Sequence, residues 1–152
     1  MKKGGAAMKL TFQKLCDEAV IPQRATPFSA GLDLSACIPE EITLNPHEIR
    51  LIPTGLAAAL DETDAMLMLC ARSGLAAKHG IGMANGVGIV DTDYRGEIRV
   101  PLINQSDTAF TVTPGMRIAQ LIVVPVLMTE VAEADTLPDT QRGAGGFGST
   151  GR

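Results

Sequence analysis

The chain is dominated by short apolar runs that alternate with turn-forming residues. Turn signals such as Asn45-Pro46 and Thr113-Pro114-Gly115 separate neighbouring runs. The runs have period-two or continuous apolar character and span Leu10 to Leu15, Leu32 to Ala36, Glu41 to Leu44, Glu48 to Ile52, Ala65 to Leu69, Ile98 to Ile103, Phe110 to Val112 and Ile118 to Val126. Their regular short spacing predicts an all-β sandwich or barrel. The one helix that we expect is short, lies around Gly74 to Lys78 and has Ser73 as its N-cap.

Length and composition predict a single domain. The 152 residues suffice for one core, and 45% hydrophobic but only 3% aromatic residues mean a core of aliphatic side chains and methionine. We expect residues 1–139 to form this β domain, with residues 1–8 as a disordered extension, and residues 140–152 to form a flexible glycine-rich tail. The run Leu121 to Val126 is apolar on both faces, which predicts either a central strand or a subunit interface.

Charge and cysteine usage exclude several classes of protein. A net charge of -4 without a Lys/Arg cluster argues against a nucleic-acid polymer as partner. No apolar stretch is long enough for a membrane span or a signal peptide, so we expect a cytoplasmic protein without a membrane partner. Cys16, Cys37 and Cys70 have no disulfide or zinc spacing and read as reduced core cysteines, and His47 and His79 lack ligand spacing.

The segment from Asn85 to Gly96 places Asp91 and Tyr94, the only tyrosine, three residues apart. Apolar residues approach and leave this segment, which predicts a β-hairpin with a polar tip. A carboxylate near phosphate can orient and deprotonate a water for in-line attack on phosphorus, and Asp91 is the candidate base.

Five further residues, at three places in the chain, are candidates for phosphate chemistry. Arg72, Ser73 and Gly74 would present a guanidinium, a hydroxyl and free N–H groups at a helix start, although an isolated Arg-Ser-Gly is more often a simple cap. Gln120 needs a polar partner, which either the backbone or a ligand would supply. Asp33 is either solvated at an edge or associated with a hydrated Mg²⁺ ion.

Five segments of the chain closely resemble the five motifs of the trimeric deoxyuridine triphosphatase (dUTPase) family. They are Ala30 to Leu34, Arg72 to Ala76, Gly88 to Gly96, Pro114 to Leu121 and Arg142 to Gly151. The resemblance covers nearly the whole chain from about Leu10 onward. It implies a homotrimer of jelly-roll-like β subunits, with each active site assembled from three chains and with Mg²⁺ bound to the triphosphate of dUTP.

The resemblance implies hydrolysis of dUTP to dUMP and pyrophosphate, which limits uracil in DNA and supplies dUMP for dTMP synthesis. On this basis Asp91 orients the attacking water, Tyr94 packs against the deoxyribose, and Asn85 with the hairpin backbone reads uracil. Close steric exclusion of the thymine methyl is needed, because a loose apolar pocket distinguishes one methyl group by only about 1–3 kcal/mol.

The same resemblance assigns the remaining roles. Arg72, Ser73, Gly74 and Gln120 match phosphate contacts, and Asp33 matches the acid associated with the water shell of the metal. In the tail, Arg142 matches the γ-phosphate partner, Phe147 covers the uracil, and Gly148 and Ser149 add substrate contacts. This sequence departs from the family's pattern at Ala71, where many members have proline.

Two alternatives to this function stay open at the level of sequence. A dCTP deaminase-type enzyme of the same fold would convert the base, but the uracil-type segment with Asp91 and Tyr94 argues against it. A non-catalytic trimer that binds dUTP would lack Asp91 or the tail arginine Arg142, and both are present.

Overall fold

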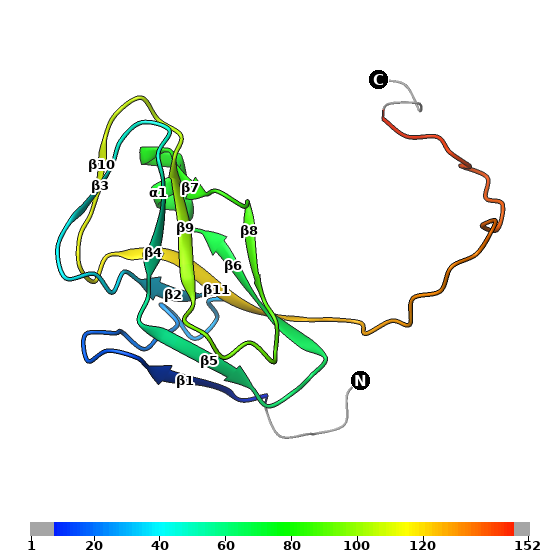
Figure 1. Cartoon of the computed structure of the whole chain (residues 1–152), viewed down its shortest axis with the longest axis horizontal. Helices are drawn as coiled ribbons and strands as arrows, with labels where there is room; N and C mark the ends of the chain where they lie inside the picture. Colours follow the sequence, from blue (N-terminus) through cyan, green and yellow to red (C-terminus); the bar gives the residue numbers. More distant parts are fainter. Residues whose placement is uncertain (1–7, 148–152) are drawn as a thin grey trace.

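The computed structural model describes residues 8–147, and these form eleven short β-strands and one helix (Figure 1). In chain order the elements are β1 (Leu10–Lys14), β2 (Leu32–Ser35), β3 (Ile42–Leu44), β4 (Ile49–Pro53), β5 (Leu56–Leu60), β6 (Ala65–Ala71), α1 (Ser73–His79), β7 (Ile81–Met83), β8 (Val87–Val90), β9 (Arg99–Asn104), β10 (Phe110–Val112) and β11 (Arg117–Pro125). The predicted all-β fold with one short helix is confirmed. Most of the predicted extension, residues 1–8, lies outside the described residues.

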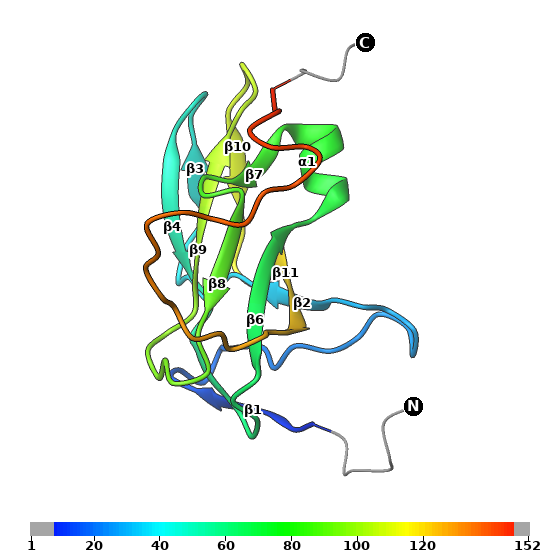
Figure 2. The same ribbon diagram turned by 90° about the vertical axis from the view of Figure 1, so that its right-hand side faces the viewer.

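Two larger sheets enclose the core. One has the strand order β2-β11-β6-β8 and the other the order β4-β9-β7, while β1 pairs with β5 and β10 with β3. Figure 2 shows β4 and β9 on one side of the molecule and β2, β6 and β11 on the other. Fully buried side chains from both sheets meet between them: Leu34, Leu69, Leu121, Ile52, Val100 and Leu102. Every strand pairing among the described residues is antiparallel.

The eight apolar runs all appear as strands, with ends that differ from the prediction by one or two residues. The runs predict strands well because period-two burial follows from the pleat. Two strands were missed. The sequence of β5 is Leu-Ala-Ala-Ala-Leu, and alanine has a low β propensity. Its extended form is stabilised by pairing with β1, where Leu10 lies opposite Leu60. The other, β7, is only three residues long.

The predicted hairpin around Asp91 is wrong in its strand pairing. β8 pairs with β6, whereas β9 pairs with β4 and β7 in the other sheet. Alternating apolar residues predict that two strands exist, but they do not identify the partner of each. The segment from Asp91 to Ile98 therefore connects the two sheets. β8 is the edge strand of its sheet, so in the described part of the chain no strand lies beside its second edge.

β11 is the central strand that the sequence offered as one of two alternatives. It lies between β2 and β6, with Leu121 opposite both Leu32 and Leu69. Its pairing with β2 ends at Leu121, whereas pairing with β6 continues to Pro125. The second half of the strand thus keeps a partly exposed face, which bears on the proposed subunit contacts below.

The helix begins one residue earlier than expected. Arg72 is the N-cap, with φ of -85° and ψ of 127°, and its carbonyl accepts the N–H of Ala76 at 3.0 Å. The helix has no side-chain cap, so the prediction of Ser73 as the cap is wrong, because Ser73 already has helical geometry. Gly80 ends the helix with φ of 66°, a conformation that favours glycine. In residues 8–147, no helix has both the length and the apolar character needed to cross a membrane.

Candidate functional site

Five predicted site residues meet in one cavity of about 360 Å³. Asp33 comes from β2, Arg72, Ser73 and Gly74 from the start of α1, and Gln120 from β11. They come together because β11 pairs with both β2 and β6, and α1 follows β6 directly. The predicted phosphate-contacting group is therefore assembled within a single chain.

The charges in this cavity are arranged around Asp33. Arg72 Nε donates to Asp33 Oδ1 at 3.0 Å, and Arg117 Nη1 donates to Asp33 Oδ2 at 2.9 Å. Arg72 Nη1 also donates to the Arg117 carbonyl at 3.2 Å. Two guanidinium groups against one carboxylate leave a net positive charge, which favours an anion.

Sequence reasoning missed Arg117, although the residue lies inside the fourth motif. Its signal was its position at the start of β11, opposite Ser35 near the end of β2. Arg117 and Asp33 are 84 residues apart in the sequence, and only the pairing of β11 with β2 brings the guanidinium to the carboxylate.

Each carboxylate oxygen of Asp33 is paired with an arginine. Neither oxygen is therefore free to bind a metal ion together with a second protein ligand. Among residues 8–147, no group of three or more His, Cys, Asp or Glu side chains is arranged to hold a metal ion. Mg²⁺ retains several waters and is commonly bound through substrate phosphates rather than by a protein cage. The residues present therefore fit a hydrated ion carried by a polyphosphate.

Gln120 lines the same cavity. Its Nε2 donates to the Ala71 carbonyl at 3.0 Å, so the backbone satisfies one donor and leaves the rest of the amide for a ligand. A Cβ on Gly31 would lie 2.5 Å from Gln120 Oε1, so glycine at this position leaves space for the amide. Ligand contact by Gln120 remains a prediction.

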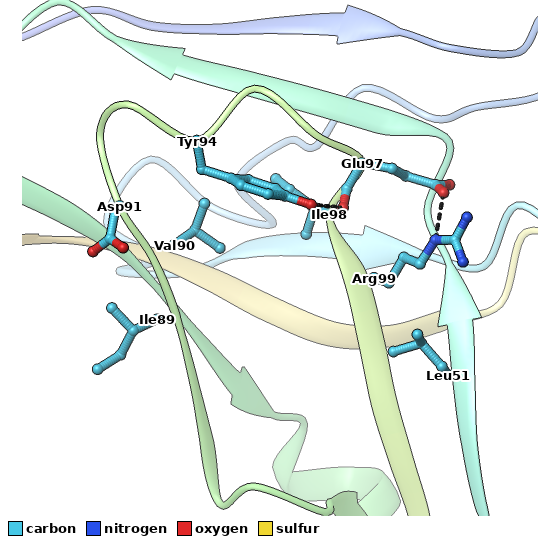
Figure 3. A pocket seen from close by; sticks show the side chains of 8 residues that line it. All are labelled: Leu51, Ile89, Val90, Asp91, Tyr94, Glu97, Ile98 and Arg99. Carbon is cyan, nitrogen blue, oxygen red and sulfur yellow. Dashed lines mark hydrogen bonds and ion pairs between the residues drawn. The ribbon is translucent and has the colours of Figure 1, made fainter.

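A second cavity, of about 310 Å³, lies between β8, β9 and β4 and contains Asp91 and Tyr94 (Figure 3). The Tyr94 hydroxyl donates to the Glu97 carbonyl at 3.1 Å, which holds the ring across Gly96. The Glu97 carboxylate accepts from Arg99 Nε at 2.7 Å and from the Gly55 N–H at 2.9 Å. In Figure 3 the Asp91 carboxylate points away from the tyrosine ring, and Asp91 is exposed.

Asn85 is not part of this cavity. It lies in the turn before β8, where its carbonyl accepts the Val87 N–H at 2.8 Å and Gly86 has φ of 72°. Asp91 follows the other end of β8. The single polar tip expected from the sequence is therefore divided between the two ends of one strand.

The two cavities share no lining residue and lie near opposite ends of β6. Val90, which precedes Asp91, pairs with Leu67, whereas Arg72 follows the last residue of β6. At about 3.3 Å per residue this separation is roughly 16 Å along the strand. One chain by itself therefore does not bring Asp91 to its own cavity around Asp33, which we name the phosphate-type cavity after the predicted roles of its residues.

Arg142 and Phe147 contact neither cavity. Arg142 Nε donates to the Gly145 carbonyl at 2.8 Å, and Phe147 is fully exposed with φ of 53°. Figure 1 shows the segment after β11 leaving the sheets. The predicted contacts of Gly148 and Ser149 lie outside the described residues.

Comparisons with known proteins place these features in context. A family model described as dUTPase matches residues 17–151. Two similar bacterial proteins are named deoxyuridine 5'-triphosphate nucleotidohydrolase: one from Desulfitobacterium hafniense is 48% identical, with 95% of each chain covered, and one from Hahella chejuensis is 47% identical, with 98% of each covered. A solved mutant of the Staphylococcus bacteriophage 80alpha dUTPase, described as bound to dUpNHpp, has a TM-score of 0.84 at 24% identity and covers 95% of this chain and 99% of its own. The last likeness concerns the fold alone.

Proposed function

The chain belongs to the dUTPase family and hydrolyses dUTP, and from this premise we propose which of its residues carry out the reaction. The products are dUMP and pyrophosphate, so the activity limits uracil in DNA and supplies dUMP for dTMP synthesis. The observation that carries the proposal is the cavity between β8 and β9. There an exposed carboxylate and a fixed tyrosine ring lie beside an edge of β8 with which no strand of residues 8–147 pairs.

We propose that the second edge of β8 reads the base. A strand edge presents alternating N–H and C=O groups, and the uracil edge carries an N–H between two carbonyls, so the two are complementary. Asn85 would add its amide at the start of the strand. Rigid backbone close to the base leaves no space for the thymine 5-methyl group, which a loose pocket would exclude only weakly.

Tyr94 selects the sugar and Asp91 directs the water. The hydroxyl of Tyr94 is held on the Glu97 carbonyl, so its ring presents a fixed surface to the deoxyribose, where a ribose 2′-hydroxyl would clash. Asp91 accepts a hydrogen bond from a water and takes its proton. The water oxygen forms a bond to the α-phosphorus, and the bond to the pyrophosphate oxygen breaks.

The cavity around Asp33 is proposed to hold the phosphate chain. Arg72, Ser73, Gly74 and Gln120 provide donors to the phosphate oxygens. Mg²⁺, when bound to the triphosphate, would neutralise part of its charge, with Asp33 accepting hydrogen bonds from the metal's waters. From the tail we propose that Arg142 pairs with the γ-phosphate, that Phe147 covers the uracil, and that Gly148 and Ser149 add contacts.

A shared active site follows from the separation of the two cavities. Asp91 must act on the α-phosphorus while Arg72 holds a neighbouring phosphate, and a separation of roughly 16 Å or more along the strand is too far for this. A second copy would bring its own phosphate-type cavity to the Asp91 of the first. This arrangement supports the proposal of a homotrimer with sites built from several chains.

One surface of the four-stranded sheet suits such a contact. We name it the outer apolar face, formed by Met66, Met68, Ile89, Ile122 and Val124. Strand registers align these residues, because Ile122 lies opposite Met68 and Met68 lies opposite Ile89. They alternate along their strands with buried core residues, so they point outward. Gln120 lies on the same face two residues before Ile122, which makes the phosphate-type cavity continuous with it.

We expect light scattering to give three times the mass of the chain, because a trimer would bury the outer apolar face. Ile89→Glu should lower the mass to that of one chain, since it places a charge in that face. Ile49→Glu is the matched control: Ile49 is 56% exposed and Ile89 is 63% exposed, but Ile49 lies on the other sheet. A monomeric mass for the unaltered chain would contradict the shared site.

A pyrophosphate-release assay tests the function directly. We expect release from dUTP and little from dCTP, dTTP or UTP, and we expect chelation of Mg²⁺ to suppress it. Conversion of dCTP with release of ammonia would indicate the deaminase alternative, and tight dUTP binding without pyrophosphate would indicate a non-catalytic trimer.

We also propose a cytoplasmic location, because three free cysteines among the described residues suit a reducing compartment.

A further inference from the structure

Two of the three cysteines are anchored to the same short connection. Cys16 follows β1 and Cys37 follows β2, and each is half-buried. The N–H of Leu15 donates to the Gly55 carbonyl at 2.8 Å, and the N–H of Cys37 donates to the Pro53 carbonyl at 2.8 Å. Both cysteines are therefore held beside the connection between β4 and β5.

The two sulfur atoms share the space that a side chain at Gly55 would occupy. A Cβ on Gly55 would lie 2.6 Å from Cys16 Sγ and 2.8 Å from Cys37 Sγ, which is closer than real Cβ contacts. Gly55 also has φ of 66°, so its backbone favours glycine as well. Both sulfurs therefore border the same small space beside Gly55.

The pair opens onto a cavity of about 520 Å³ that the proposed reaction does not use. Glu18, Pro39, Pro114 and Gly115 line it together with the two cysteines, so a small molecule has access to the sulfurs. A hydrogen bond with Cys16, burial and the negative charges of Cys16, Glu18 and Glu97 raise the pKa of Cys37 to about 11. Cys37 thus keeps its proton at neutral pH.

We propose that Cys16 and Cys37 are a redox-active dithiol that closes to a disulfide when a two-electron oxidant, a peroxide or a small-molecule disulfide, enters this cavity. With hydrogen peroxide, Cys16 loses its proton as its sulfur attacks one oxygen, the O–O bond breaks, and a sulfenic acid and a water form. Cys37 then attacks the Cys16 sulfur, the S–S bond forms, and the sulfenic oxygen leaves as water with the Cys37 proton. The sulfurs lose two electrons and the peroxide gains them.

The disulfide would close a loop that contains part of the phosphate-type cavity. Ser29, Gly31 and Asp33 lie between the two cysteines in the chain and line that cavity. A cross-link restricts the unfolded chain, so the oxidised protein should resist thermal unfolding. In a reducing cytoplasm the bond would form only transiently, under oxidative stress.

The test is to oxidise the full chain with hydrogen peroxide or with oxidised glutathione and to analyse it without reduction. We expect the number of titratable thiols to fall from three to one and the tryptic peptides 15–24 and 25–50 to be linked. The Tm should rise by about 5–10 °C and return on treatment with dithiothreitol. None of these measurements depends on dUTP turnover.

Cys70→Ser is the matched control and should form the linkage as the unaltered chain does. Cys16→Ser and Cys37→Ser should each abolish both the linkage and the Tm rise. Three titratable thiols after oxidation, a linkage that includes Cys70, or conversion of Cys16 to sulfinic acid without a linked peptide would each overturn the proposal. A linked peptide without a Tm rise would overturn the stabilising role of the disulfide.

Discussion

Replacing Asp91 by asparagine is expected to lower kcat for dUTP by about 10³-fold, because general-base catalysis of this kind contributes on the order of 10² to 10⁴. Asparagine has nearly the same shape as aspartate, so it keeps the contacts of the cavity but cannot take the proton of the attacking water. Pyrophosphate release measures kcat. Calorimetric titration with a non-hydrolysable dUTP analogue should show affinity close to that of the unaltered protein.

Asp93→Asn is the matched control for this experiment. Asp93 lies in the same connection and carries the same charge, but it does not line the cavity with Tyr94. Its replacement should leave kcat nearly unchanged. Near-normal turnover by Asp91→Asn would refute its assignment as the base. An equal loss in both variants would show that the carboxylates act only through the charge or fold of the connection.

Ending the chain at Asp139 is expected to lower kcat by about 10²-fold, as loss of groups that close and complete a site does. Fixing a tail costs on the order of 1–2 kcal/mol per residue, so the tail should close only when Arg142 and Phe147 gain contacts with the nucleotide. The fold should be unaffected, because most of the described tail residues are exposed and none belongs to the hydrophobic core or packs against it. Circular dichroism and light scattering check this point.

Single substitutions separate the two proposed roles of the tail. Arg142→Ala should remove the proposed contact with the γ-phosphate, which dUMP lacks. We therefore expect a large fall in kcat for dUTP and a smaller loss of affinity for dUMP. Phe147→Ala should lower the binding affinity for dUTP and for dUMP to the same extent, because a stacked ring recognises the base that both nucleotides share. An unchanged rate after truncation would mean that residues 140–152 do not take part in the reaction.

The existence of the strands could be predicted from the sequence, whereas their partners could not. Alternating burial along Ala65 to Leu69 or Ile118 to Val126 is a local property of each segment. The partner of a strand depends on contacts between distant residues, so β8 was assigned to a hairpin with β9 but pairs with β6. β5 was missed for the same reason, because its alanines become strand-like only beside β1.

The candidate site divides in a similar way. Residue types and their order identified Asp91, Tyr94, Arg72 and Gln120, since reactive groups and glycine-rich segments are visible in the chain itself. Arg117 was missed because its role comes from an ion pair with Asp33 across two strands. The neighbouring sulfurs of Cys16 and Cys37 were missed too, because their spacing in the chain carries no signal of a pair.

By itself, the sequence determined the class of fold, the chemical groups available and the family to which they belong, because these depend on local pattern and composition. Only the tertiary structure decided that Asp91 and Arg72 lie at opposite ends of β6. The tertiary structure also placed the outer apolar face beside Gln120 and brought the thiols of Cys16 and Cys37 next to Gly55. Such positions arise from the register and stacking of strands that are far apart in the chain, and local preferences do not encode them.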